Sequence, residues 1–303
     1  MHHTLTRITI GAGLIAGTGA VLAADIPIAR WSGLPIAPCF WLLLLAALWM
    51  GCWEFFRMLR CKGHPCRPAI ALVFITLLVV CAWMEIHCPW DILSWLHVRR
   101  LELYLLLIVA LVFTTFLAEI LRIERSGGDT ARAMASVGWT VVVVLTVGLL
   151  GVFLAKVRFL SLDPVEGLLY LGLTLGVVKG SDIGAYAIGS TLGRHRLVPT
   201  LSPKKTIEGL CGGIGAGIVV AMAIGCGWGR FSAVQMLIFG ATVSISGVLG
   251  DLAESLIKRS CGVKDSGPIP GFGGALDILD SMLAAGPVAY LALVVLTGAA
   301  QVG

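Results

Sequence analysis

Residues 250–281, GDLAESLIKRSCGVKDSGPIPGFGGALDILDS, concentrate carboxylates and cations in an otherwise apolar chain. Asp251, Glu254 and Lys258 recur at helical spacing and so share one face of a predicted helix. Asp277 and Asp280 repeat this spacing on a second predicted helix, after a loop rich in glycine and proline. Two such helices can converge on a divalent cation, with basic residues beside it for phosphate oxygens. A solvated hairpin with surface ion pairs is the alternative.

A second polar group lies inside the apolar run 166–192, where Lys179 and Asp182 stand three residues apart. Each costs about 2.5–3.5 kcal/mol to insert into lipid, so both need a partner or a polar cavity. The spacing allows them to pair with each other. We expect Asp182 to line a polar cavity that admits a cation, and a purely structural ion pair is the alternative.

The segment LSPKKTIEG at 201–209 predicts a helix start, with Ser202 as N-cap and Pro203 as the first helical residue. Lys204 and Lys205 would then oppose the helix dipole, a conflict that a bound anion would resolve. A topology signal is the alternative use of this lysine pair. Farther along, Gly209, Gly213 and Gly217 predict close helix packing rather than a phosphate loop.

Nine cysteines form no recognisable disulfide framework, and several lie within apolar runs. Cys61, His64 and Cys66 in CKGHPC, with Cys52 upstream, could bind zinc, but a second ligand pair at standard spacing is missing. We therefore expect reduced thiols.

The elements that position these groups must be membrane helices, because the chain is 58% hydrophobic and only 13% charged. Soluble domains are roughly a quarter charged, so soluble, disordered and fibrous classes are excluded. The fold class is an all-α polytopic transmembrane bundle of about nine spanning helices. The predicted spans are 8–24, 33–50, 69–87, 102–121, 135–155, 166–192, 208–226, 231–249 and 282–300. Residues 1–24 also resemble a signal peptide, but a first span is the favoured interpretation.

Most of the 22 Lys and Arg residues fall in alternate connections, which places the N-terminus inside the cell. The net charge of +5 is thus a topology signal and not a nucleic-acid footprint. Residues 1–160 are interpreted as a transmembrane scaffold. Residues 161–303 form the catalytic region, with cytoplasmic loops 193–207 and 250–281.

This C-terminal pattern resembles the phosphatidate cytidylyltransferase (CDP-diacylglycerol synthase) family over roughly residues 165–300. The residues that match the family signature in order and spacing are Ser255, Lys258-Arg259, Lys264-Asp265, Pro270-Gly271, Gly273-Gly274, Asp277 and Asp280. Further family elements are Asp182 with Ala185-Tyr186, Ser202 to Thr206 with Glu208, and Gly250-Asp251-Leu252 with Glu254. Phe272 and Ile278 replace the family's histidine and arginine, but the carboxylates are intact, so we expect an active variant.

The resemblance implies an integral membrane nucleotidyltransferase of bacterial inner-membrane type that makes CDP-diacylglycerol and pyrophosphate from CTP and phosphatidate with Mg²⁺, one ion or two. It also suggests a homodimer. Residues expected to be catalytic are Asp251, Lys258, Arg259, Lys264, Asp265, Asp277 and Asp280, with Asp251, Asp277 and Asp280 as metal ligands. Residues expected to bind substrate are Asp182, Ser202, Lys204, Lys205, Thr206, Glu254, Ser255, Gly273 and Gly274. The rivals are a CTP-dependent lipid or polyprenol kinase, an ion transporter and an inactive paralogue.

Overall fold

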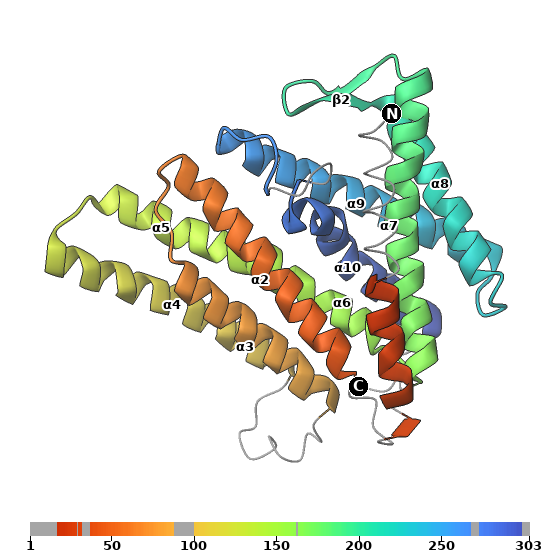
Figure 1. The fold of residues 1–303 in the computed structure, drawn as a ribbon, viewed down its shortest axis with the longest axis horizontal. Coiled ribbons are helices and arrows are strands. Elements are labelled where there is room, and N and C mark those ends of the chain that lie inside the picture. The colour runs from red at the N-terminus through yellow and green to blue at the C-terminus, as the bar shows by residue number, and fades with distance from the viewer. Residues whose placement is uncertain are drawn as a thin grey trace. The chain divides into compact units, whose positions relative to one another are not determined.

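The computed structural model describes residues 17–28, 30–31, 37–87, 100–161, 163–267 and 273–298. Within these ranges, eight helical runs are long and apolar enough to cross a membrane (Figure 1). They are α2 (Pro38–Cys61), α3 (Pro68–His87), α4 (Arg100–Ser126), the continuous α5 (Thr130–Val143), η3 (Val144–Leu149) and α6 (Leu150–Arg158), α7 (Pro164–Leu192), α8 (Ile207–Gly225), α9 (Ala233–Ser260) and α10 (Ala275–Thr297). The predicted class, a polytopic helical membrane protein, is confirmed.

Several predicted spans differ in extent from the observed helices: α2 continues to Cys61, past the predicted end at 50, and α10 begins at Ala275, before the predicted start at 282. Of the first predicted span, 8–24, only residues 17–24 are described, within a short apolar helix, Gly17–Ile28; residues 1–16 lie outside the described ranges. The predicted span 231–249 and the predicted helix that carries Asp251, Glu254 and Lys258 form one continuous helix, α9, which ends at Ser260.

The chain divides into two compact units. The first contains residues 1–155 and 261–276, in which α3 packs against α2 and α4. Glycines allow close approach in this unit: a Cβ added at Gly148 of η3 would lie 2.9 Å from Cγ1 of Ile75. The predicted functional boundary at residue 160 lies near this division, but its meaning for function stays a prediction.

The second unit contains residues 156–260 and 277–303, with α7 packed along α8 and α8 along α9. Its helix contacts depend on glycine. A Cβ added at Gly213 would lie 2.9 Å from the carbonyl oxygen of Ser181, and one at Gly217 would collide with the hydroxyl of Ser244. The predicted small-residue packing of this helix is therefore confirmed.

Between α7 and α8 the chain forms an antiparallel hairpin of β1 (Arg196–Val198) and β2 (Ser202–Thr206), in which Arg196 pairs with Thr206. The prediction that Ser202 caps the following helix is wrong. The N-cap is Thr206, whose Oγ1 accepts the N–H of Gly209 at 3.1 Å. Strand pairing extends the backbone through the Ser-Pro segment, so the helix begins four residues later than local capping signals indicate.

This correction also removes the argued conflict with the helix dipole. Lys204 and Lys205 precede α8 and lie on β2, not in the first helical turn. The hairpin is joined to α8 by Glu208, which accepts the N–H of Arg194 at 3.0 Å and lies 2.6 Å from Nδ1 of His195.

Candidate active site

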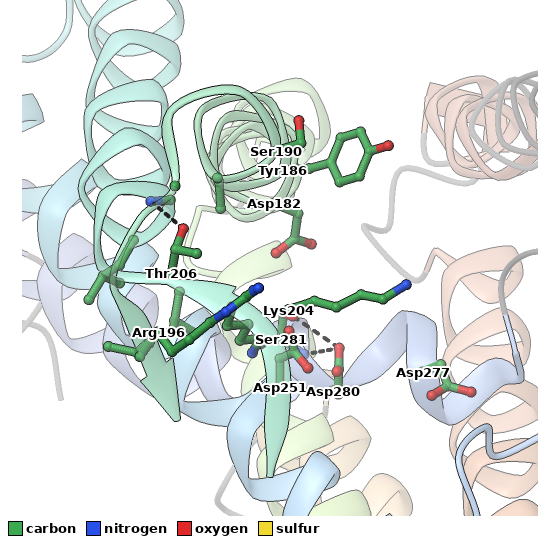
Figure 2. A pocket seen from close by; sticks show the side chains of 18 of the residues that line it. Asp182, Tyr186, Ser190, Arg196, Lys204, Thr206, Asp251, Asp277, Asp280 and Ser281 are labelled. Carbon is green, nitrogen blue, oxygen red and sulfur yellow. Dashed lines mark hydrogen bonds and ion pairs between the residues drawn. The ribbon is translucent and has the colours of Figure 1, made fainter. Parts of the chain in front are cut away.

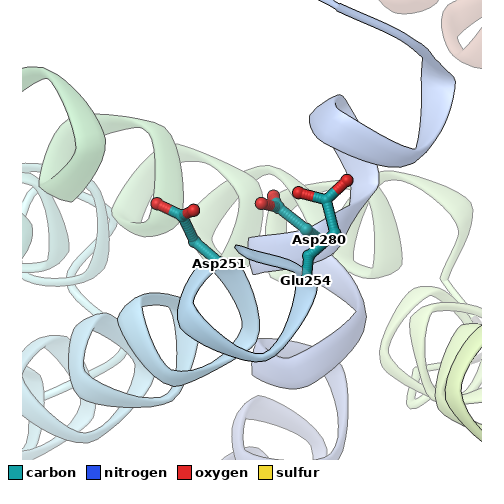
Figure 3. Close-up of side chains that lie close together, drawn as sticks. All are labelled: Asp251, Glu254 and Asp280. Carbon is teal, nitrogen blue, oxygen red and sulfur yellow. The ribbon is translucent and has the colours of Figure 1, made fainter. Parts of the chain in front are cut away.

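Three carboxylates of the second unit gather at one point. Asp251 and Glu254 project from α9 and Asp280 from α10, and each offers an oxygen within 4.8 Å of the others (Figure 3). Their spacing on α9 places the first two on one helix face. Within the described ranges, these are the grouped His, Cys, Asp and Glu side chains that could hold a metal ion.

Glu254 is the most buried member of this group, at 4% exposure. Its Oε1 is buried and has no hydrogen-bond partner among the described residues. A buried carboxylate oxygen ordinarily has a donor or a cation beside it. Three carboxylates, one of them with an unsatisfied oxygen, form a donor set that could hold a divalent metal ion.

Lysines neutralise this acidic group from two elements. Nζ of Lys205, on β2, lies 2.6 Å from Oδ2 of Asp251. Nζ of Lys258, on α9, lies 2.6 Å from Oε2 of Glu254 and 2.5 Å from Oδ1 of Asp277. The carboxylates and cations are therefore already interleaved.

Asp277 occupies a different position from its predicted one among the metal ligands. Its carboxylate pairs with Lys258, and Figure 2 shows it apart from Asp251 and Asp280. The structure brings Glu254 into the acidic group instead. Metal ligation by Asp277 stays a prediction.

Lys179 and Asp182 on α7 form an ion pair, and Asp182 also lines a polar cavity. Nζ of Lys179 lies 3.1 Å from Oδ2 of Asp182 and donates to the carbonyl oxygen of Ile278 at 3.4 Å. Asp182 also lines the cavity described next. The ion pair and the cavity interpretation are thus compatible.

A cavity of about 700 Å³ opens beside the acidic group in the second unit (Figure 2). Its charged lining residues are Asp182, Arg196, Lys204, Lys205, Asp251, Lys258, Asp277 and Asp280. Thr206, Ser281, Ser190 and Tyr186 add hydroxyl groups. The volume falls within the range of small-molecule sites, and cations among carboxylates suit a phosphate ligand with a metal.

Several predicted site residues are not among those that line this cavity. Arg259 donates from Nε to the carbonyl oxygen of Leu201 at 3.1 Å and so supports the hairpin turn. Ser255 is buried in α9, and Ser202 pairs with Val198 in the hairpin. The predicted loop residues Lys264, Asp265, Gly273 and Gly274 belong to the first unit. Residues 268–272, which include Pro270, Gly271 and Phe272, lie outside the described ranges.

Sequence reasoning missed Arg196 as a cavity residue and treated it only as one of the basic residues that indicate membrane topology. Its place on β1, beside the lysine-bearing β2, is the signal that a hairpin prediction would have supplied. Cys52, Cys61, His64 and Cys66 do not form a metal-binding group, and the cysteines within the described ranges are not joined in disulfides.

Fold and site together define a multi-span membrane protein with a charged cavity built from its C-terminal helices. Comparison with known proteins gives the family. The model of the cytidylyltransferase family matches residues 14–296, and the chain belongs to this family.

Individual relatives are of two kinds. The chain is 32% identical over 274 residues to the uncharacterized protein YnbB of Escherichia coli K12, a match that covers 87% of this chain and 85% of that protein. It is 42% identical over 132 residues to a phosphatidate cytidylyltransferase of Staphylococcus aureus, covering 43% of this chain and 50% of that enzyme. The Bacillus subtilis phosphatidate cytidylyltransferase is 37% identical over 159 residues, covering 52% and 58%. The chain thus matches about half the length of these enzymes.

Proposed function

We propose that this chain transfers the cytidylyl group of CTP to phosphatidate, forming CDP-diacylglycerol and pyrophosphate. The observation that carries the proposal is the cavity in which Asp251 and Asp280, two members of the acidic group, lie beside basic side chains. Membership of the cytidylyltransferase family and the partial matches to phosphatidate cytidylyltransferases support it.

The proposed reaction requires little acid–base chemistry. A phosphate oxygen of phosphatidate attacks the α-phosphorus of CTP, and the bond from that phosphorus to the bridging oxygen of the β-phosphate breaks. Pyrophosphate leaves with the electron pair. The second pKa of a phosphate monoester is about 6, so the nucleophile is already mostly deprotonated at neutral pH. The residues must therefore orient two polyanions and reduce their repulsion.

The cations of the cavity come from distinct elements: Arg196 and Lys204 from the hairpin, and Lys258 from α9. Such a spread suits a chain of phosphates better than a single ion. Asp251, Glu254 and Asp280 would hold Mg²⁺, which supplies positive charge for phosphate oxygens when bound.

Lys205 and Lys258 are proposed to change partners during binding. Lys205 pairs with Asp251, and Lys258 pairs with Glu254 and Asp277. With Asp251 and Glu254 held to a metal ion, the two ammonium groups would be available to donate to phosphate oxygens, as charge-assisted hydrogen bonds. The same side chains then serve the free and the loaded site.

The proposed location is a bacterial inner membrane with the hairpin and the α9–α10 connection on the cytoplasmic side, where CTP is present. Exposed side chains on the cavity-lining helix α7 suit a lipid substrate: Ile183 is 69% exposed and Tyr186 is 78% exposed. Ile183 follows Asp182 directly and Tyr186 lies one helical turn after it, so a lipid headgroup can approach Asp182 from the bilayer side.

Purified protein in phosphatidate-containing micelles with Mg²⁺ tests the reaction when CTP is labelled separately at the α- and γ-phosphates. Cytidylyl transfer places the α-label in the lipid and the γ-label in pyrophosphate. A lipid kinase would place the γ-label in the lipid. Absence of labelled lipid from both substrates, with folded protein and several divalent ions, would exclude both transferases and favour the transporter or inactive alternatives.

A further inference from the structure

Helix α10 is capped at its start by a side chain from a distant part of the sequence. It begins at Ala275, and the preceding Gly274 has no side chain that could accept a hydrogen bond. Helices leave their first N–H groups without partners inside the helix. In this protein the acceptor comes from α2: Oε1 of Glu54 accepts the N–H of Ala275 at 2.9 Å, and Oε2 accepts that of Leu276 at 2.8 Å.

The same carboxylate is enclosed by the segment that leads into α10. Ser266 donates from Oγ to Oε2 of Glu54 at 3.1 Å. A Cβ added at Gly267 would lie 2.7 Å from Oε1, and one added at Gly274 would collide with Oε2. Glu54 is only 8% exposed, and all these residues belong to the first unit. One buried carboxylate thus binds the chain on both sides of residues 268–272.

We propose that Glu54 is a positioning residue for the reaction, because it sets where α10 begins and therefore how Asp277 and Asp280 are presented. Asp277 lies in the first turn of α10, the part of a helix that frays when its cap is lost. Asp280 follows one turn later on the same face. This role rests on the proposed function, although the cap itself does not.

A carboxylate suits this position for two reasons. Its two oxygens accept from two successive N–H groups and from a hydroxyl at once. Its charge is also favourable at a helix N-terminus. An amide at residue 54 keeps the shape but turns one acceptor into a donor, so Glu54→Gln is the informative change.

The test compares Glu54→Gln with Asp25→Asn in the full-length protein. Asp25 caps α2 in the same manner, accepting the N–H groups of Cys39 at 3.0 Å and Phe40 at 2.9 Å, but it caps a helix that carries none of the cavity carboxylates. We expect Glu54→Gln to speed amide exchange in a peptide covering 275–281 by about tenfold. The turnover number should fall about 10- to 100-fold. The KM for CTP should change by less than about threefold, because the hairpin cations that bind its phosphates are untouched.

A second-site rescue separates positioning from general damage. A side chain at residue 274 would occupy the space of the Glu54 carboxylate, so Gly274→Asp alone should be harmful. A Cβ at residue 274 would also collide with the hydroxyl of Ser266, so the rescue variant replaces that serine as well. In Glu54→Ala/Ser266→Ala/Gly274→Asp both obstacles are removed, and the new carboxylate can cap α10 locally. This variant should regain at least about tenfold in turnover over Glu54→Ala/Ser266→Ala.

Each outcome is decisive for one claim. Unchanged exchange at 275–281 in Glu54→Gln would overturn the cap. Faster exchange with unchanged turnover, or equal losses in Asp25→Asn, would overturn the positioning role. If the wild type makes no CDP-lipid, the proposed function fails, and the exchange comparison then decides the cap by itself.

Discussion

Each unit of the molecule contains a buried acidic group, and the two groups are built differently. In the first unit, Glu119 is 3% exposed and both its oxygens are satisfied. Oε1 accepts from Nε of Arg67 at 2.7 Å and from Oγ of Ser136 at 2.6 Å, and Oε2 accepts from Nε of Arg122 at 2.7 Å. One carboxylate thus has three donors.

In the second unit each carboxylate has fewer partners: Lys205 pairs with Asp251, Lys258 with Glu254, and Ser281 donates to Asp280. Three carboxylates crowd together, and one oxygen of Glu254 has no partner among the described residues. Like charges at this distance oppose one another, so the arrangement is poorer for stability than that around Glu119. The comparison teaches that a saturated buried charge serves the fold, whereas a crowded and partly unsatisfied group is kept for a ligand.

The largest effect is expected for Asp280→Asn, which tests whether the crowded acidic group of the second unit is kept for a ligand. It removes one charge from the crowded group, so we expect turnover to fall by more than about 100-fold, beyond the usual loss for an outer-shell partner. The melting temperature without divalent ions should stay level or rise, because repulsion is relieved. Labelled-CTP assays and thermal melting in detergent measure the two effects. A folded variant with near-normal turnover would exclude Asp280 as a ligand.

The effect of divalent ions on thermal stability gives a second test of the difference between the two acidic groups. Mg²⁺ at 100 times its dissociation constant should stabilise the wild type by about 2.7 kcal/mol. Glu254→Gln should lose most of this gain, whereas Glu119→Gln should keep it. Equal Mg²⁺ shifts in both variants would show that the ion binds away from the second unit's acidic group. Thermal melting across a Mg²⁺ series makes the measurement.

Glu119→Gln should lower stability and leave turnover almost unchanged, which is the opposite of the result expected for Asp280→Asn. It weakens a saturated, charge-assisted set of hydrogen bonds, at a cost of about 1–3 kcal/mol in stability. Turnover of the folded fraction should stay within about twofold of the wild type, since Glu119 is in the first unit and does not line the cavity. A large loss of turnover at unchanged stability would assign the Glu119 cluster to the site instead.

The effect of Asp277→Asn on turnover should lie between those of Asp280→Asn and Glu119→Gln. Because Asp277 pairs with Lys258, its loss should lower turnover by about tenfold, as for a residue that orients another. If Asp277 is the metal ligand that the sequence predicted, the loss will instead match that of Asp280→Asn. Parallel kinetic measurement of the two variants distinguishes these roles.

Helical spacing explains which parts of this molecule were predictable. The spans follow from apolar length, and the faces that hold Lys179 with Asp182, and Asp251 with Glu254, follow from separations of three residues. These relations are local, so they can be read directly. The predicted convergence of α9 and α10 carboxylates also follows from two such faces, although Glu254 joined the group where Asp277 was expected.

What escaped prediction depends on contacts between distant segments. Ser202 has every local feature of an N-cap, but pairing with β1 holds it in a strand. Glu54 stands 221 residues before the N–H group of Ala275 that it accepts, in an apolar helix where nothing nearby indicates its partner. Such roles require the three-dimensional arrangement.

The lysines of the cavity have a consequence for how the protein is made. Lys205 and Lys258 act as built-in counter-ions, so the newly synthesised chain need not wait for a metal before its acidic helices settle in the bilayer. Small zinc domains show the opposite behaviour, since they unfold when the ion is removed. Biogenesis of this protein should therefore proceed in cells starved of magnesium, and chelation of the purified protein should leave its helices intact.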